Sequence, residues 1–149
     1  MSNQSQQRRQ SRRRALQALY QWDIADGDVR DIDAQFLATQ DMSKADVGYF
    51  QELLHAIPAE LSEIDASLQG CLDRELSRLD PIERNVLRIA THELRARHDI
   101  PYRVIINEAV ELTKIFGAEQ GHKYVNGVLD AVAQQLRSNE TAAQINAGS

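Results

Sequence analysis

Apolar residues recur along most of this chain at helical spacing, and no segment shows the strict alternation of a half-buried strand. The clearest pattern covers residues 47–68, where apolar positions follow one another at alternating steps of three and four. Such a stripe favours helices that pack at shallow angles in a bundle; a coiled-coil dimer is the alternative. Pro58 lies inside it, so we expect a kink or two helices that meet there. The stripe consists of Val47, Phe50, Leu54, Ile57, Leu61, Ile64 and Leu68.

Shorter apolar stripes predict the other helices. With the long stripe, they indicate an all-α protein of six or seven helices and no internal repeat. They lie in residues 12–25, 32–37, 86–94, 105–116 and 125–136.

Polar residues at the edges of these stripes predict where helices begin and end. Ser43 and Asp46 have the spacing of a capping box that opens the third helix. The segment DPIE at 80–83 supplies a capping Asp, a Pro in the first turn and a Glu that reaches back. Gly117 follows a stripe at the position of a C-cap.

Composition divides the chain into a core and two ends. Residues 1–10 are rich in Gln and Ser and are expected to form a mobile basic arm, whereas residues 138–149 have the composition of a disordered tail. Residues 11–137 are long enough for one helical domain with a core of its own.

The single cysteine, Cys71, excludes an internal disulfide. No segment approaches the roughly 18 apolar residues of a membrane span, and the N-terminus lacks the apolar stretch of a signal peptide. We therefore expect a soluble cytoplasmic protein.

The net charge of −5 hides an asymmetry, because residues 1–14 hold five arginines and no acid. The remaining 135 residues carry 12 basic and 22 acidic side chains, a net charge of −10. A solvated tail is one interpretation; clustered arginines are also a common footprint of nucleic-acid binding. The cluster consists of Arg8, Arg9, Arg12, Arg13 and Arg14.

The sequence contains no recognisable motif for catalysis or for metal binding. His92 and His98 are six residues apart, which is not the spacing of a zinc-binding HExxH helix. The glycine-rich stretch GAEQGHKYVNG at 117–127 lacks the GK[ST] ending of a phosphate-binding loop. We expect no enzyme activity, no metal and no cofactor.

The remaining groups suit single-stranded nucleic acid: arginines for phosphates, aromatic rings for stacking and small polar side chains for base edges. Tyr20, Phe116 and Tyr124 are the candidate platforms, although each alone is more often a core residue. Tyr124 is the strongest, because it adjoins Lys123 near the start of a helix and between glycines.

Several segments together resemble the NusB transcription antitermination family. They are RRRALQALYQWD (12–23), FLATQDMSKADVGYFQELL (36–54), ERNVLRIATHEL (83–94) and, most specifically, PYRVIINEAVELTKIFGAEQGHKYVNGVLD (101–130). The likeness spans nearly all the chain between Arg8 and Leu136.

The resemblance implies an all-helical fold of two packed helical subdomains and a non-enzymatic role. Members of the family bind the boxA element of nascent RNA together with NusE, which is also a small-subunit ribosomal protein. With other Nus factors they act on the RNA polymerase elongation complex, notably on ribosomal RNA operons. We expect NusE to raise the affinity for boxA, because a small acidic protein with one basic arm would bind RNA weakly by itself.

The resemblance also implies which residues face RNA. Gln120 stands where the family commonly has an acid, which removes a repulsive charge, and Tyr124 stands where phenylalanine is common. The candidate RNA-binding residues are Arg8, Arg9, Arg12, Arg13, Tyr20, Glu83, Phe116, Gln120, Lys123 and Tyr124.

Two other functions remain open. The same helical module precedes the catalytic region of certain ribosomal RNA cytosine methyltransferases, but this sequence ends at Ser149 without such a region, which disfavours an enzyme. A homodimer that hides the arginine-rich face is the other alternative, and the apolar stripe 47–68 is compatible with it.

Overall fold

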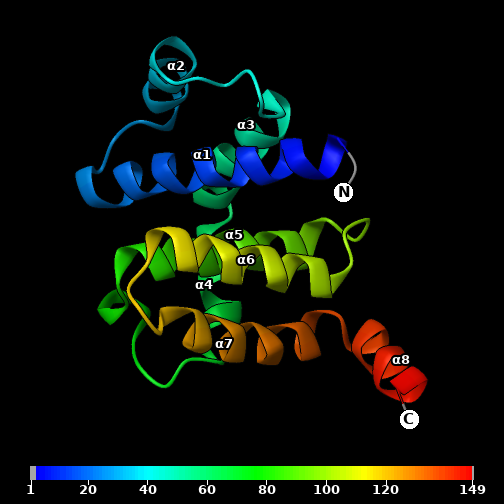
Figure 1. The fold of residues 1–149 in the computed structure, drawn as a ribbon. Coiled ribbons are helices and arrows are strands. Elements are labelled where there is room, and N and C mark those ends of the chain that lie inside the picture. The colour runs from blue at the N-terminus through cyan, green and yellow to red at the C-terminus, as the bar shows by residue number, and fades with distance from the viewer. Residues whose placement is uncertain (1–2, 149) are drawn as a thin grey trace. The chain divides into compact units, whose positions relative to one another are not determined.

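A computed structural model describes residues 3–148, and the side chains of residues 3–143. The all-α prediction is confirmed, with eight α-helices and one 3₁₀ turn among the described residues instead of the six or seven helices expected (Figure 1). The chain divides after Leu61 into two compact units, called unit 1 and unit 2 below. The elements are α1 (Asn3–Ala25), α2 (Val29–Thr39), α3 (Val47–Ala59), α4 (Leu61–Gln69), η1 (Leu76–Arg78), α5 (Pro81–Ala96), α6 (Tyr102–Phe116), α7 (Gly121–Leu136) and α8 (Ser138–Gly148).

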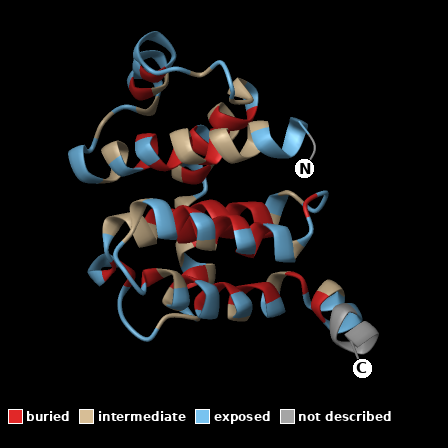
Figure 2. Cartoon of the chain, in the orientation of Figure 1, coloured by how far each residue is buried: buried red, intermediate tan, exposed pale blue. Residues whose placement is uncertain are grey.

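Unit 1 is built from α1, α2 and α3, which contact one another in all three pairs. The buried residues of α1 form a stripe along one side of the helix, as an amphipathic pattern predicts (Figure 2). Phe36 of α2 stacks on Phe50 of α3 with the ring centroids 5.8 Å apart. This aromatic pair joins the two later helices of the unit.

The long apolar stripe is shared by two helices, as Pro58 led us to expect. Pro58 lies in the last turn of α3, which ends at Ala59, and α4 begins at Leu61. Most of the stripe is fully buried within the chain, so it leaves little apolar surface for a coiled-coil dimer. These buried residues are Phe50, Leu54, Ile57, Ile64 and Leu68.

Of the two helix starts predicted from capping residues, that of α5 is correct and that of α3 is not. Asp80 caps α5 by accepting from the backbone N–H groups of Ile82 and Glu83, as expected. The capping box of α3 is wrong, because Asp46 itself is the N-cap and accepts from the N–H of Tyr49 at 3.1 Å. The Ser43 hydroxyl instead donates to the carboxylate of Asp41.

Both ends of the described chain are more helical than their composition suggests. Helix α1 already begins at Asn3, and α8 covers Ser138–Gly148. Tertiary contacts support the early start of α1: the Ser11 hydroxyl donates to the backbone carbonyl of Asp46 at 2.7 Å. The N–H of Asp46 in turn lies 3.4 Å from the carbonyl of Gln7. Helix stability of this kind comes from packing and not from an apolar pattern.

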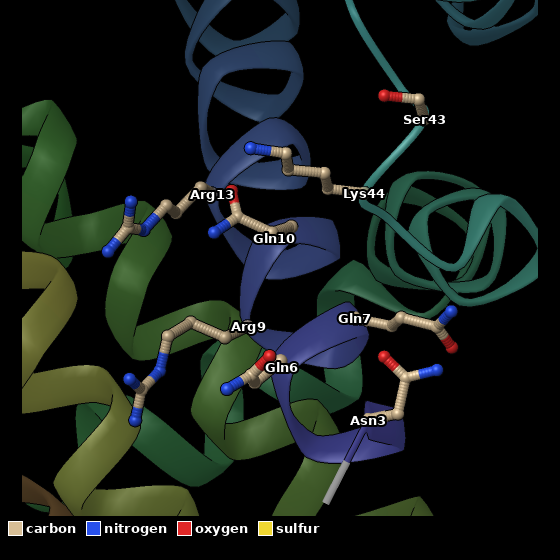
Figure 3. A pocket seen from close by; sticks show the side chains of 8 residues that line it. All are labelled: Asn3, Gln6, Gln7, Arg9, Gln10, Arg13, Ser43 and Lys44. Carbon is tan, nitrogen blue, oxygen red and sulfur yellow. The ribbon is translucent and has the colours of Figure 1, made fainter. Parts of the chain in front are cut away.

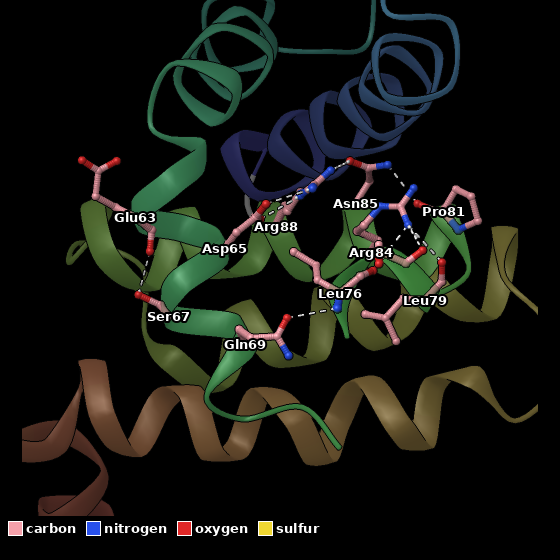
Figure 4. A network of polar contacts seen from close by, with 11 residues as sticks. Glu63, Asp65, Ser67, Gln69, Leu76, Leu79, Pro81, Arg84, Asn85 and Arg88 are labelled. Atoms are coloured by element: carbon pink, nitrogen blue, oxygen red, sulfur yellow. Dashed lines mark hydrogen bonds and ion pairs between the residues drawn. The ribbon is translucent and has the colours of Figure 1, made fainter. Parts of the chain in front are cut away.

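In unit 2, α5, α6 and α7 contact one another pairwise. Helix α5 is buried on every side from Asn85 to Leu94, so it is the central helix of the unit (Figure 2). Its polar residues need partners at this depth. Arg88, whose side chain is 7% exposed, forms a fork with both carboxylate oxygens of Asp65 in α4, each at 3.0 Å (Figure 4).

Arg137 and Glu140, at the junction of α7 and α8, hold the ends of two other helices. The buried Arg137 guanidinium donates to the carbonyls of Glu93 and Leu94 in the last turn of α5, and also to those of Arg97 and Ile100. Glu140 pairs with Arg137 at 2.7 Å and accepts from the N–H of Tyr102 at the start of α6. A cation thus meets a helix C-terminus and an anion meets an N-terminus, as the helix dipoles favour.

Candidate nucleic-acid interface

A polar pocket of about 420 Å³ lies between the first half of α1 and the segment that precedes α3 (Figure 3). Of the residues that the structure describes, three cations and several amides line it, and no acidic side chain does. Side chains of this kind match phosphates and base edges. The lining residues are Asn3, Gln6, Gln7, Arg9, Gln10, Arg13, Ser43 and Lys44.

Helical geometry explains why α1 supplies most of this pocket. Arg9 and Arg13 are four residues apart, which places both on one face of the helix. Lys44 extends toward this face from the segment between α2 and α3 (Figure 3). Among the described residues, the Nε atom of Arg13 is buried without a hydrogen-bond partner. The structure therefore brings together two of the predicted arginines and a lysine that we did not predict.

Arg8 and Arg12 point to a different feature, the ring of Tyr49 in α3. Their guanidinium carbons lie 5.3 and 5.7 Å from its centroid, within the range of cation–π contacts. Arg12 is only 3% exposed. These two arginines attach α1 to α3, which is a structural role that the sequence pattern did not distinguish from RNA binding.

Tyr20 lies apart from the basic pocket, in the second half of α1. It is 39% exposed and lines an apolar hollow of about 490 Å³ together with Ile24 and Phe36. Arg13 and Tyr20 are seven residues apart in sequence, which corresponds to about 10 Å along a helix. Tyr20 is thus available as a platform, but it does not line the pocket of the arginines.

The other predicted residues belong to unit 2 and surround the start of α7. Gln120 is the N-cap of α7, adopts a left-handed backbone with φ of 76° and gives no side-chain capping bond. Lys123 is exposed, whereas Phe116 and Tyr124 are half-buried. The left-handed residue in the turn before α7 is thus Gln120, and none of the glycines that the structure describes has a positive φ.

Glu83 lies directly against Gly121, the first residue of α7. A Cβ atom at position 121 would overlap the Glu83 carboxylate, so the glycine permits this close approach. Burial raises the pKa of Glu83, and the charge of Asp80 adds to the effect. Glu83 is therefore held beside the proposed RNA residues of α7.

Tyr124 has two neighbours that the sequence did not reveal. Its hydroxyl donates to Asp73 Oδ1 at 2.9 Å, and the guanidinium carbon of Arg74 lies 4.8 Å from its ring centroid.

Gly127, one turn further along α7, has open space around it, so no neighbouring helix requires a glycine there.

The described part of the chain shows no group of three or more His, Cys, Asp or Glu side chains that could hold a metal ion. None of its helices combines the length and apolar character needed to cross a membrane.

Comparison with known proteins decides the family. The family model described as "NusB family" matches residues 9–134. The transcription antitermination protein NusB of Pseudomonas entomophila is 51% identical over 139 residues, which cover 93% of this chain and 84% of that protein. This chain belongs to the NusB family.

Three further matches each cover 85% or more of this chain. The NusB protein of Hahella chejuensis is 48% identical, and the alignment covers 96% of each chain. The crystal structure of NusB from T. maritima superposes with a TM-score of 0.73 at 35% identity, covering 85% of this chain and 90% of that one. A chain from the crystal structure of a plectonemic RNA supercoil gives a TM-score of 0.76 at 25% identity, with 86% and 94% covered.

The NusB-family chain contains three polar residues near the candidate sites that sequence reasoning missed: Lys44, Asp73 and Arg74. The only signal for Lys44 was its place in the segment SKAD, which we interpreted as a capping box. Asp73 and Arg74 are 50 or more residues from Tyr124 in sequence, and only the fold of unit 2 brings them to its ring.

Proposed function

We propose that this protein is a non-catalytic, cytoplasmic transcription antitermination factor. It binds boxA RNA in nascent transcripts, notably those of ribosomal RNA operons, together with NusE. Through other Nus factors it then acts on the elongating RNA polymerase.

The observation that carries this proposal is an identity of about half of all residues to proteins named for transcription antitermination, over more than nine-tenths of the chain. The match to a chain solved in an RNA-containing crystal adds support for an RNA ligand. An acidic chain with a local basic pocket is also suited to holding one polyanion in one place.

RNA binding is proposed for residues in both units. In unit 1 the basic pocket offers Arg9, Arg13 and Lys44 to phosphates. In unit 2 the exposed Lys123 offers a phosphate contact, and Tyr124 with Arg74 over its ring offers a stacking surface.

The first test measures the affinity of fluorescently labelled boxA RNA and of a scrambled RNA, each with and without NusE. We expect boxA to bind more tightly than the scrambled RNA, and NusE to strengthen boxA binding strongly. Equal affinities for both RNAs would contradict the proposal that the protein recognises boxA. Equal boxA affinities with and without NusE would remove the cooperative model.

A second test addresses the basic pocket. Replacing both Arg9 and Arg13 with alanine is expected to weaken binding and to reduce the slope of log affinity against log salt by about 1.4, because each phosphate contact on a single strand contributes about 0.7. The double substitution Arg30→Ala/Arg103→Ala removes the same charge from exposed positions outside the pocket. If both double variants change the slope equally, the effect is one of net charge and the pocket has no role. Lys44→Ala by itself is expected to lower the slope by about 0.7.

A further inference from the structure

The segment between α4 and η1 places a charged pair against Tyr124. Arg74 Nε and Nη2 contact the two carboxylate oxygens of Asp73 at 2.8 and 3.2 Å. The Tyr124 hydroxyl donates to the same carboxylate at 2.9 Å, and the Arg74 guanidinium lies over the ring, 4.8 Å from its centroid. The three side chains form a closed set in which each member contacts the other two.

The backbone segment that carries Asp73 and Arg74 is itself held by hydrogen bonds with the side chains of Gln69 and Arg84. The side chain of Gln69 donates to the carbonyl of Arg74 at 2.9 Å and accepts from the N–H of Leu76 at 3.1 Å, the second of which is drawn in Figure 4. Further along the same segment, Arg84 Nη1 donates to the backbone carbonyl of Leu79 at 3.1 Å (Figure 4). The guanidinium of Arg74 is thus pre-organised, which lowers the entropy cost of binding a ligand.

The pairing with Asp73 determines what Arg74 can bind. Asp73 occupies the Nε–Nη2 edge, one of the two edges through which a guanidinium forms a fork with a phosphate, and its negative charge repels a second anion. Hydrogen bonds from Arg74 and Tyr124 lower the pKa of Asp73 to about 2, so the carboxylate stays charged at any ordinary pH. A phosphate is therefore a poor ligand for Arg74.

The Arg74 side chain is half exposed where it lies over Tyr124. Its guanidinium carbon is 4.8 Å from the ring centroid, and 50% of the side chain is accessible to solvent. A planar guanidinium stacks on aromatic and base rings in the same way as on tyrosine. Lys123, next to Tyr124 and exposed, can neutralise the phosphate of a nucleotide placed there.

We propose that Arg74, fixed by Asp73 and the Tyr124 hydroxyl, is a base-stacking platform, on which an unpaired RNA base stacks to give the order tyrosine, guanidinium, base. This proposal rests on the proposed RNA-binding function and adds a residue and a mode of contact to it. It also gives the Tyr124 hydroxyl a role, because a phenylalanine at this position could not hold Asp73.

The decisive variant is the charge-neutral double substitution Asp73→Ala/Arg74→Ala. We expect it to weaken the binding of boxA RNA, measured in the presence of NusE, by about ten-fold with an unchanged salt slope, because a stacked base and not a phosphate contact is lost. The matched control is Arg97→Ala/Asp99→Ala, a second arginine–aspartate fork with distances of 3.1 and 3.2 Å, which is expected to bind normally.

Two single variants separate the parts of the platform. Arg74→Lys keeps the charge but removes the plane, and we expect most of the ten-fold loss. Tyr124→Phe keeps the ring but releases Asp73, and we expect a loss of about two- to three-fold. Thermal unfolding of each variant verifies that the fold is retained.

The results have separate meanings. Binding of the Asp73→Ala/Arg74→Ala variant equal to wild type, or full binding by Arg74→Lys, overturns the platform while leaving boxA binding intact. A salt slope that falls by about 0.7 also overturns it, since Arg74 would then contact a phosphate. If the wild-type protein with NusE does not distinguish boxA from scrambled RNA, the proposed function fails, whatever the variants do.

Discussion

Arg137 offers the sharpest test of how unit 2 is held together, because a single buried side chain closes the end of the central helix. We expect Arg137→Met to destabilise the protein strongly. Methionine keeps an unbranched stem of similar length but supplies no donor, so the carbonyls of Glu93, Leu94, Arg97 and Ile100 lose their side-chain partner at once.

The magnitude follows from the geometry. The donor–acceptor distances to the four carbonyls lie between 2.8 and 3.2 Å, and the side chain of Arg137 is only 3% exposed. A hydrogen bond to a charged group contributes about 1.5–3 kcal/mol, and such contributions are not additive within one network. We therefore expect a loss of about 3–5 kcal/mol, a large part of the roughly 5–15 kcal/mol that stabilises a typical domain. Glu140 loses its partner as well, but at 37% exposure it can be hydrated.

The assay is urea denaturation followed by far-ultraviolet circular dichroism, with the slope m compared between variants to verify that the transition is the same. Arg137→Lys keeps the charge but has a single donor group, and an intermediate loss is expected. Arg78→Met, at an exposed position in η1, is the control and is expected to stay within about 0.5 kcal/mol of wild type. A free energy of unfolding for Arg137→Met within about 1 kcal/mol of wild type would refute the argument that these carbonyls depend on Arg137.

Four further outcomes are expected. Gly127→Ala is expected to raise the free energy of unfolding by about 0.5–1 kcal/mol, because the site is open and helical. Gly117→Ala is expected to lower it by about 1–2 kcal/mol, because the new Cβ would come within 2.8 Å of the Thr113 carbonyl oxygen. Asp46→Ala removes the N-cap of α3 and is expected to cost about 1 kcal/mol, measured by the same denaturation. The depressed pKa of Asp73 means that its stabilising contribution is complete above the ordinary value of 3.8 and is lost as the pH falls through about 2. A carbon NMR titration is expected to give Asp73 a pKa near 2 in the wild type and a pKa closer to 3.8 in Arg74→Ala.

Local interactions explain why parts of the fold were predictable. The stripes of α3, α5, α6 and α7 and the cap at Asp80 depend on neighbours within one or two turns, so spacing alone indicates them. The start of α1 was missed because residues 3–10 have no apolar stripe, and the contacts at Ser11 that support this turn come from α3. Arg137 drew no attention for the same reason, since its five acceptors lie elsewhere in unit 2 or across the helix boundary.

The sequence by itself determined the helical class, most helix positions, the family resemblance and the types of residue that suit RNA. Only the tertiary structure separated Arg9 and Arg13, which line a pocket, from Arg8 and Arg12, which stack on Tyr49. The same is true of Asp73 and Arg74, which become neighbours of Tyr124 through folding alone. Arginines in one run have nearly the same local sequence context, and what each can bind depends on the groups that folding brings beside it.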